Sequence, residues 1–222
     1  MIIDARYCGP DGSGNGGYVA GLLSKELTAH TVTVTLRQPP PLAHELRLDR
    51  DESGNGVRLF DGERLIAEAF TGAIVVPQVP AVPYEVALEG AEKYRAAESH
   101  PFPRCFVCGP EREDGMGGMG LEPGPVGEGL VASPWTAESP SHELLWAALD
   151  CPGGWSCFQP ERPALLGTMT AQVVELPRDG ERCVVMGLAR SREGRKLHAA
   201  TAAYGADGRL LGRAEQIWIQ SR

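Results

Sequence analysis

The sequence predicts an α+β fold in which one unit, a helix followed by an antiparallel sheet, occurs twice. Two observations carry this prediction. Each half of the chain begins with an apolar helical segment and continues with several strand-like segments. Each half also contains an Asp-Gly hairpin signal, at 61–62 and at 207–208, and the segments that follow, 64–69 and 209–214, are alike. The chain is therefore expected to be a fused duplicate.

The first unit contains one helix and four strands. Apolar residues in 18–27 recur at helical spacing after a glycine-rich entry. Residues 31–36 alternate strictly between threonine and aliphatic side chains, the pattern of a half-buried strand. Further strands are expected at 45–48, 57–60 and 64–69, with the Asp-Gly turn between the last two.

The middle of the chain is rich in proline and glycine, which interrupt regular elements. We therefore expect a linker at 76–135 with a short helix near 91–97. This divides the chain into a first repeat (1–75), the linker, and a second repeat (136–222). The second repeat is expected to have a helix at 144–150 and strands at 166–175, 183–188, 197–204 and 210–219.

Composition narrows the class of partner. The chain has 222 residues, 42% of them hydrophobic, and a net charge of −8. That charge argues against nucleic acid and anionic membranes as partners. The N-terminus shows neither a signal peptide nor a membrane-spanning run, so a cytoplasmic protein is expected. Six cysteines in a chain of this length do not indicate a disulfide framework.

One carboxylate, Asp150, lies in a run without any other charge, 144–155. Burying an ionised carboxylate is costly unless its pKa rises or it gains a specific hydrogen bond. Such a residue is a candidate general base. The pattern Asp-Cys-Pro is also typical of a helix start, in which Asp150 would cap a helix beginning again at Pro152. Both interpretations stay open at this level.

Two further motifs bear on ligands. Cys105 and Cys108 have the C-x-x-C-G spacing of a zinc knuckle, but no second pair accompanies them, so buried thiols are favoured and no metal is expected. Arg190 opens a basic run at 190–196 that could meet phosphates. A solvated hairpin tip explains the same run.

The chain resembles a known family at three places. These are the Asn-Gly-Gly entry to the first helix (15–23), the following strand with its prolines (31–41), and Ala148 to Asp150 together with 207–216. All three are similar to the hotdog-fold thioesterase superfamily, in the single-chain double-hotdog form of the type II acyl-CoA thioesterases. The resemblance implies two antiparallel sheets, each wrapped around a central helix, that form a pseudo-dimer.

The resemblance also implies an activity, the hydrolysis of acyl-CoA or another acyl thioester without any cofactor. Asp150, Gln216 and Ser191 would together position the attacking water. The family has a histidine directly after the aspartate, whereas this chain has Cys151 and Pro152. The resemblance is compatible with both a monomer and a homodimer.

The expected fold also suggests which residues make the remaining substrate contacts. Gly16 and Gly17 would let a thioester carbonyl approach the start of the first helix, where the N–H of Gly17 or Tyr18 could stabilise an oxyanion. Trp146 and Trp155, with Tyr18, would line an acyl pocket, although core packing explains them equally well. Arg190 would meet the phosphates of coenzyme A.

The internal repeat predicts a single site. Aligning the two helix starts places Ser24 opposite Asp150, and aligning the turns places Thr71 opposite Gln216. The acid and the amide therefore occur only in the second copy. An alternative from another class is a non-catalytic acyl-CoA-binding or lipid-binding module, and a third is a zinc-stabilised interaction protein.

Overall fold

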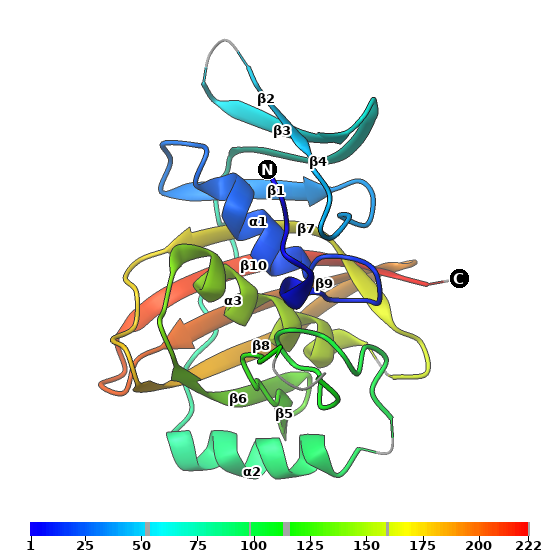
Figure 1. Ribbon diagram of the computed structural model, residues 1–222. Coiled ribbons are helices and arrows are strands. Elements are labelled where there is room, and N and C mark those ends of the chain that lie inside the picture. Colours follow the sequence, from blue (N-terminus) through cyan, green and yellow to red (C-terminus); the bar gives the residue numbers. More distant parts are fainter. Residues whose placement is uncertain (52–53, 98, 113–115, 159, 222) are drawn as a thin grey trace.

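A computed structural model describes residues 1–51, 54–97, 99–112, 116–158 and 160–221 (Figure 1). Its strands form one antiparallel sheet in the order β2-β3-β4-β1-β7-β10-β9-β8-β6-β5. The helices are α1 (Gly16–Ser24), α2 (Tyr84–Arg95) and α3 (His142–Cys157), after a 3₁₀ turn at Ala5–Tyr7. The strands are β1 (Thr31–Leu36), β2 (Arg47–Arg50), β3 (Gly56–Asp61), β4 (Arg64–Thr71), β5 (Gly124–Gly127), β6 (Leu130–Ala137), β7 (Ala164–Val173), β8 (Glu181–Glu193), β9 (Lys196–Tyr204) and β10 (Leu210–Gln220).

The duplication predicted from the sequence is visible in the sheet. Outward from the central β1–β7 junction the first half runs β1, β4, β3, β2, and the second half runs β7, β10, β9, β8. The Asp-Gly turns join the equivalent hairpins β3–β4 and β9–β10. At the junction Val34 pairs with Met169, so the expected two sheets form one continuous sheet.

Both central helices begin in the same way and pack against each other on one face of the sheet (Figure 1). The Asn15 side chain accepts a hydrogen bond from the Tyr18 N–H at 2.9 Å, and Ser141 accepts one from the Leu144 N–H at 3.3 Å. These N-caps are the positions that the repeat alignment equates.

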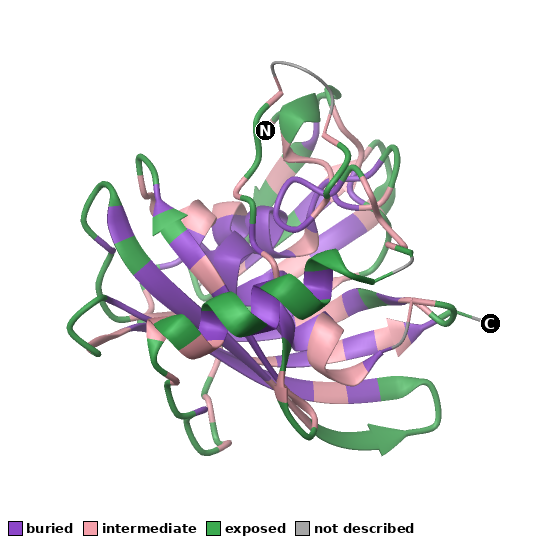
Figure 2. Ribbon diagram, turned by 90° about the horizontal axis from the view of Figure 1, so that it is seen from below, coloured by how far each residue is buried: buried purple, intermediate pink, exposed green. Residues whose placement is uncertain are grey.

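The third helix, α2, covers the opposite face beside β5 and β6. Strand β8 shows the two faces, because Cys183 and Val185 belong to the main core whereas Val184 and Met186 pack in a second cluster with Ala87 of α2. Figure 2 shows α2 with buried positions on one side and exposed positions on the other.

The segment 76–135 contains more regular structure than the short helix that is expected near 91–97. Helix α2 begins earlier and is 12 residues long, and β6 pairs with β8 along its whole length. Small side chains explain the difference, because the buried stripe of α2 consists largely of Ala87, Gly90 and Ala91, which do not stand out as an apolar face in the sequence. The domain boundaries stay a prediction. Among the described residues, no helix is long and apolar enough to cross a membrane.

Candidate functional site

The start of α1 lies directly against the middle of α3, and glycine permits this contact. A Cβ atom at Gly17 would lie 2.5 Å from the Cβ of Asp150 and 2.7 Å from the carbonyl oxygen of Trp146. One turn later, a Cβ at Gly21 would lie 2.7 Å from the Cα of Glu143. The two glycines therefore let the helix backbones approach closely enough for the Asp150 side chain to reach the first turn of α1.

Asp150 is only 2% exposed, and its two oxygens have different surroundings. Oδ2 accepts hydrogen bonds from the Gly17 N–H at 2.9 Å and from the Asn15 side-chain amide at 3.0 Å. Oδ1 is buried and has no hydrogen-bond partner among the described residues. One oxygen thus fixes the carboxyl group, and the other keeps an acceptor that none of the described residues uses.

Burial raises the pKa of Asp150 to about 7, although the hydrogen bonds from Gly17 and Asn15 act in the opposite direction. No cation forms an ion pair with this carboxylate among the described residues. A carboxylate with a pKa near neutrality can exchange a proton at physiological pH, which is the requirement for a general base.

The alternative in which Asp150 caps a helix beginning again at Pro152 is wrong. Helix α3 is continuous from His142 to Cys157 and contains both residues. Pro152 lacks an N–H, so the helix loses one internal donor there. Gln216 of β10 contacts the same stretch of backbone, because its amide nitrogen donates to the carbonyls of Leu149 at 2.7 Å and Asp150 at 3.2 Å. Asp150 instead satisfies a free N–H at the start of the other helix, α1.

A cleft of about 310 Å³ opens beside Asp150 between the two halves of the chain. Its wall is mainly apolar, with Trp155 and Phe158 on one side and Gly14 to Gly16 at the start of α1. The other contributors come from both halves and from the linker, and they include Leu36, Pro39, Pro40, Phe102, Cys105, Cys108, Cys151, Leu166 and Trp218. Such a site can hold a small apolar group next to the carboxyl group of Asp150.

The predicted residues at the start of α1 have separate roles. Gly16 lines the cleft, and the helix provides no acceptor for its N–H. The N–H of Gly17 is bound to Asp150, and that of Tyr18 is bound to the side chain of Asn15. The Tyr18 ring stacks on Tyr7 with centroids 3.8 Å apart and does not line the cleft. Gly16 is thus the candidate oxyanion donor at this helix start.

Of three other predicted residues, one lines the cleft and two do not. Trp155 lines it. Trp146 is fully buried where α3 meets Gly21 of α1, so it belongs to the core. Gln216 is buried behind the backbone of α3, and its amide oxygen accepts from the indole N–H of Trp218 at 2.9 Å. The amide of Gln216 therefore holds α3 in place, and it does not line the cleft.

The structure does not bring Ser191 or Arg190 to Asp150. Ser191 is exposed on the long β8–β9 hairpin, where it pairs with His198, and it does not line the cleft. Arg190 donates to the carbonyl of Pro77 at 2.7 Å. Both residues lie near the C-terminal end of β8, which extends for 13 residues.

The repeat alignment also holds at the second helix start. Ser24 of α1 lies at the start of α3, with its hydroxyl 2.7 Å from Nε2 of His142. Asp150 of α3 lies in the same way at the start of α1. The two sites are thus equivalent in position but differ in chemistry, as the alignment of Ser24 with Asp150 predicts.

Two groups of contacts at the site are not evident from the sequence. Asn15 is recognisable as an N-cap, yet its amide also donates to Asp150 across 135 positions of sequence. Cys151 joins Cys105 and Cys108, and the three sulfurs all lie within 4.8 Å of one another. Hydrogen bonds from the other two thiols lower the pKa of Cys105 well below its ordinary value. Only the fold could show these long-range contacts.

No protein-family model matches the chain, and no curated protein matches it. Solved structures do match over nearly its whole length. They include a conserved protein of unknown function with a hotdog fold from Alicyclobacillus acidocaldarius, with 14% identity, a TM-score of 0.60 and coverage of 99% of this chain and 91% of the other. A putative thioesterase from Novosphingobium aromaticivorans has 12% identity, a TM-score of 0.62 and coverage of 100% and 94%.

An acyl-CoA thioesterase II from Mycobacterium marinum is similar as well, with 13% identity, a TM-score of 0.55 and coverage of 93% and 88%. Identities this low establish the fold alone. The chain has the hotdog fold in tandem, with one continuous sheet around two central helices, and the fold expected from the sequence is confirmed.

Proposed function

We propose that this chain hydrolyses acyl thioesters, with acyl-CoA as the substrate class, and that Asp150 is the general base. The observation that carries the proposal is the buried, unpartnered Oδ1 of Asp150 beside an apolar cleft at a helix start. Structural neighbours named as thioesterases support the same reaction class.

The reaction needs three groups near one carbonyl carbon. Oδ1 of Asp150 accepts a proton from a water molecule as the water oxygen bonds to the thioester carbon. The Gly16 N–H and the positive end of α1 stabilise the resulting oxyanion. When that intermediate collapses, the carbon–sulfur bond breaks, and the proton passes from Asp150 to the leaving thiolate. The products are a carboxylic acid and a thiol.

The other residues of the site bind or position. Trp155, Phe158 and Leu166 contact the acyl group through the apolar wall of the cleft. Arg37 lines the same cleft and is a candidate partner for a phosphate of the carrier. Gln216 is a positioning residue in this proposal, because it holds the α3 backbone at Asp150 from behind.

A second candidate is a module that binds acyl thioesters without turnover. It is favoured by one observation, that the N–H groups of Gly17 and Tyr18 are already bound within the protein. The oxyanion would then have only one backbone donor at this helix start.

Hydrolysis of acyl-CoA of increasing chain length by the purified protein tests both candidates. We expect turnover of at least one chain length and a decrease in kcat of about 10²–10⁴-fold in Asp150→Asn. Asp49→Asn, an exposed acid on β2, is the matched control and should retain full activity. Binding without turnover in the wild-type chain selects the module, and unchanged turnover in Asp150→Asn removes Asp150 from the mechanism.

A further inference from the structure

The segment 105–109 (Cys-Phe-Val-Cys-Gly) forms a tight turn that points two thiols in one direction. The Gly109 N–H donates to the Cys105 carbonyl at 2.8 Å, and a Cβ at Gly109 would collide with backbone atoms of Pro103 and Cys105. The nearby backbone N–H groups of Cys108 and Val107 act with the neighbouring thiols to lower the pKa of Cys105, because they favour its thiolate.

Helix α3 supplies a third thiol to this turn. The sulfurs of Cys105 and Cys151 are 3.8 Å apart, and the sulfur of Cys108 lies within 4.8 Å of both. A tetrahedral zinc with Zn–S bonds of about 2.3 Å has sulfur–sulfur edges of about 3.8 Å. A cation could therefore enter between the three sulfurs with only small shifts of the side chains.

The spacing alone does not select a metal, because two thiols in van der Waals contact lie equally far apart. The third sulfur and the burial of the cluster favour a bound metal over a simple contact between thiols. All three thiols are buried, and a disulfide would join two of them and leave the third unused. A buried thiolate without a cation is costly, and soft thiolate ligands favour zinc over harder cations.

The place of the cluster in the fold gives a second argument. The turn belongs to a segment, 99–112, without helix or strand, and this segment lies against α3 at Cys151. The segment is tied to the N-terminal part of the chain by the Arg104–Asp11 ion pair and by the Phe106 N–H, which donates to the Cys8 carbonyl at 2.7 Å, and to α2 by the Tyr94 hydroxyl, which donates to the Cys108 carbonyl. A bound metal would add a strong link between this segment and α3, because metal binding stabilises the folded arrangement of its ligands.

We propose that Cys105, Cys108 and Cys151 bind one zinc ion whose fourth coordination position faces the cleft. All three cysteines line that cleft, as Asp150 does. Three protein ligands and one open position are typical of zinc sites that take a water or a substrate atom. The Asn15 amide lies 3.9 Å from the sulfur of Cys105 and also donates to Asp150, so one side chain connects the two groups.

Metal analysis of the full chain, purified without chelator from zinc-supplemented cells, tests this site independently of any activity. We expect about one zinc per chain in the wild type and a loss of most of it in Cys108→Ser. Cys183→Ser is the matched control, since Cys183 is a buried thiol of β8 outside the cluster, and it should retain its zinc.

Cobalt provides a measurement that does not depend on the folding of a variant. Adding Co²⁺ to the metal-free, reduced wild-type chain should produce thiolate-to-cobalt charge-transfer absorption and the intense visible bands of tetrahedral cobalt. Absence of both the zinc and these bands would overturn the proposal. A disulfide between Cys105 and Cys151, found by mass spectrometry of the alkylated, unreduced protein, would also overturn it.

Discussion

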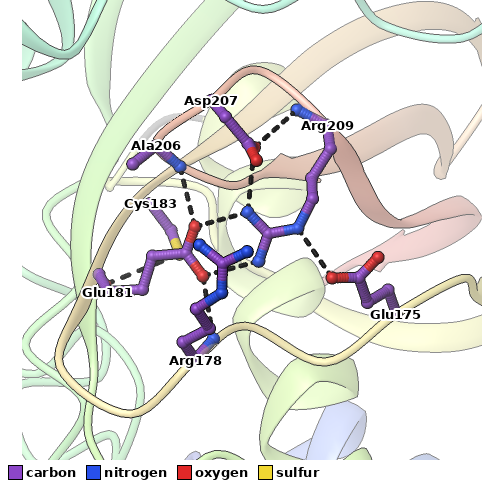
Figure 3. Close-up of polar contacts among 7 residues, drawn as sticks. All are labelled: Glu175, Arg178, Glu181, Cys183, Ala206, Asp207 and Arg209. Atoms are coloured by element: carbon purple, nitrogen blue, oxygen red, sulfur yellow. Dashed lines mark hydrogen bonds and ion pairs between the residues drawn. The ribbon is translucent and has the colours of Figure 1, made fainter.

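Two buried carboxylates, Asp150 and Glu181, have opposite environments in this molecule. Glu181 of β8 has a side chain that is 6% exposed, and both of its oxygens accept from the Arg209 guanidinium, at 2.6 and 2.7 Å (Figure 3). The N–H groups of Arg178 and Ala206 donate to it as well, at 2.8 and 3.0 Å. The hydrogen bonds from Arg209 lower the pKa of Glu181 to about 2.

Asp150 is more deeply buried, at 2% exposed against 9% for the whole residue, and among the described residues no cation pairs with it, so burial raises its pKa to about 7. The comparison teaches that the partners of a buried acid, together with its burial, decide its role. Glu181 is a structural group that remains ionised, with every oxygen bound. Asp150 lines a cleft and has one oxygen without a hydrogen-bond partner among the described residues, at a cost in stability that a purely structural residue would not justify.

The largest expected effect on stability comes from separating Asp150 of α3 from the start of α1. Gly17→Ala places a methyl group 2.5 Å from the Cβ of Asp150, so α1 must move away from α3. We expect the free energy of unfolding to decrease by about 3 kcal/mol, as for overpacking of a tight core contact. Urea denaturation measures it. Gly127→Ala is a control for the substitution type, since its added Cβ would meet Leu130 at an ordinary van der Waals distance of 3.5 Å. An equal loss in both variants would contradict the close contact.

Glu181→Gln tests the carboxylate that is paired with a cation. Removing the charge leaves Arg209 without its main partner, and we expect a loss of about 2 kcal/mol at neutral pH. The folded pKa of about 2 lies below the ordinary value of 4.5, so the wild-type contribution is complete above about pH 5 and is lost as the pH falls toward 2.

The difference between wild type and Glu181→Gln should therefore shrink between about pH 5 and about pH 3, measured by urea denaturation at each pH. Glu175→Gln removes a more exposed partner of Arg209 and should have a much smaller effect. A difference that stays constant with pH would show that Glu181 does not act through its charge.

The periodic segments of this chain can be predicted from the sequence because their patterns are local. Alternation in 31–36 and the two Asp-Gly turns are sufficient for β1 and for the hairpins that end each half. Helix α2 begins earlier than the sequence predicts, because its buried stripe consists largely of alanine and glycine, which carry little hydrophobic signal. Pro152 suggests a helix break, yet α3 is continuous from His142 to Cys157.

The candidate site is predictable only in part. Asp150 stands out as a lone charge in an apolar run, and Gly16 as the start of a helix. The contacts that define the site join residues far apart in the sequence, such as Cys108 with Cys151 and Asn15 with Asp150. No local pattern encodes such pairings. Ser191, which the family resemblance implies, does not line the cleft, because it is exposed on the β8–β9 hairpin.

A smaller effect is expected at Asn15, which joins the cap of α1 to the carboxylate. Asn15→Ser keeps a capping oxygen and removes the amide donor to Asp150. We expect stability to fall by about 1 kcal/mol and kcat by about tenfold, since one hydrogen bond to the carboxylate is lost. Thermal unfolding and turnover measure the two quantities. Ser141→Ala, which removes only the cap of α3, should change stability alone.

The smallest expected change in stability is at the residue with the largest expected role in chemistry. Asp150→Asn keeps an oxygen that can accept from Gly17 and removes the cost of a buried carboxylate without a cation. We expect the free energy of unfolding slightly above neutral pH to stay within about 0.5 kcal/mol of the wild type, or to rise by about 1 kcal/mol. Urea denaturation beside Glu181→Gln gives the direct comparison. A loss of about 2 kcal/mol or more in Asp150→Asn would place both carboxylates in the same structural class, and the unbound oxygen of Asp150 would then need another explanation.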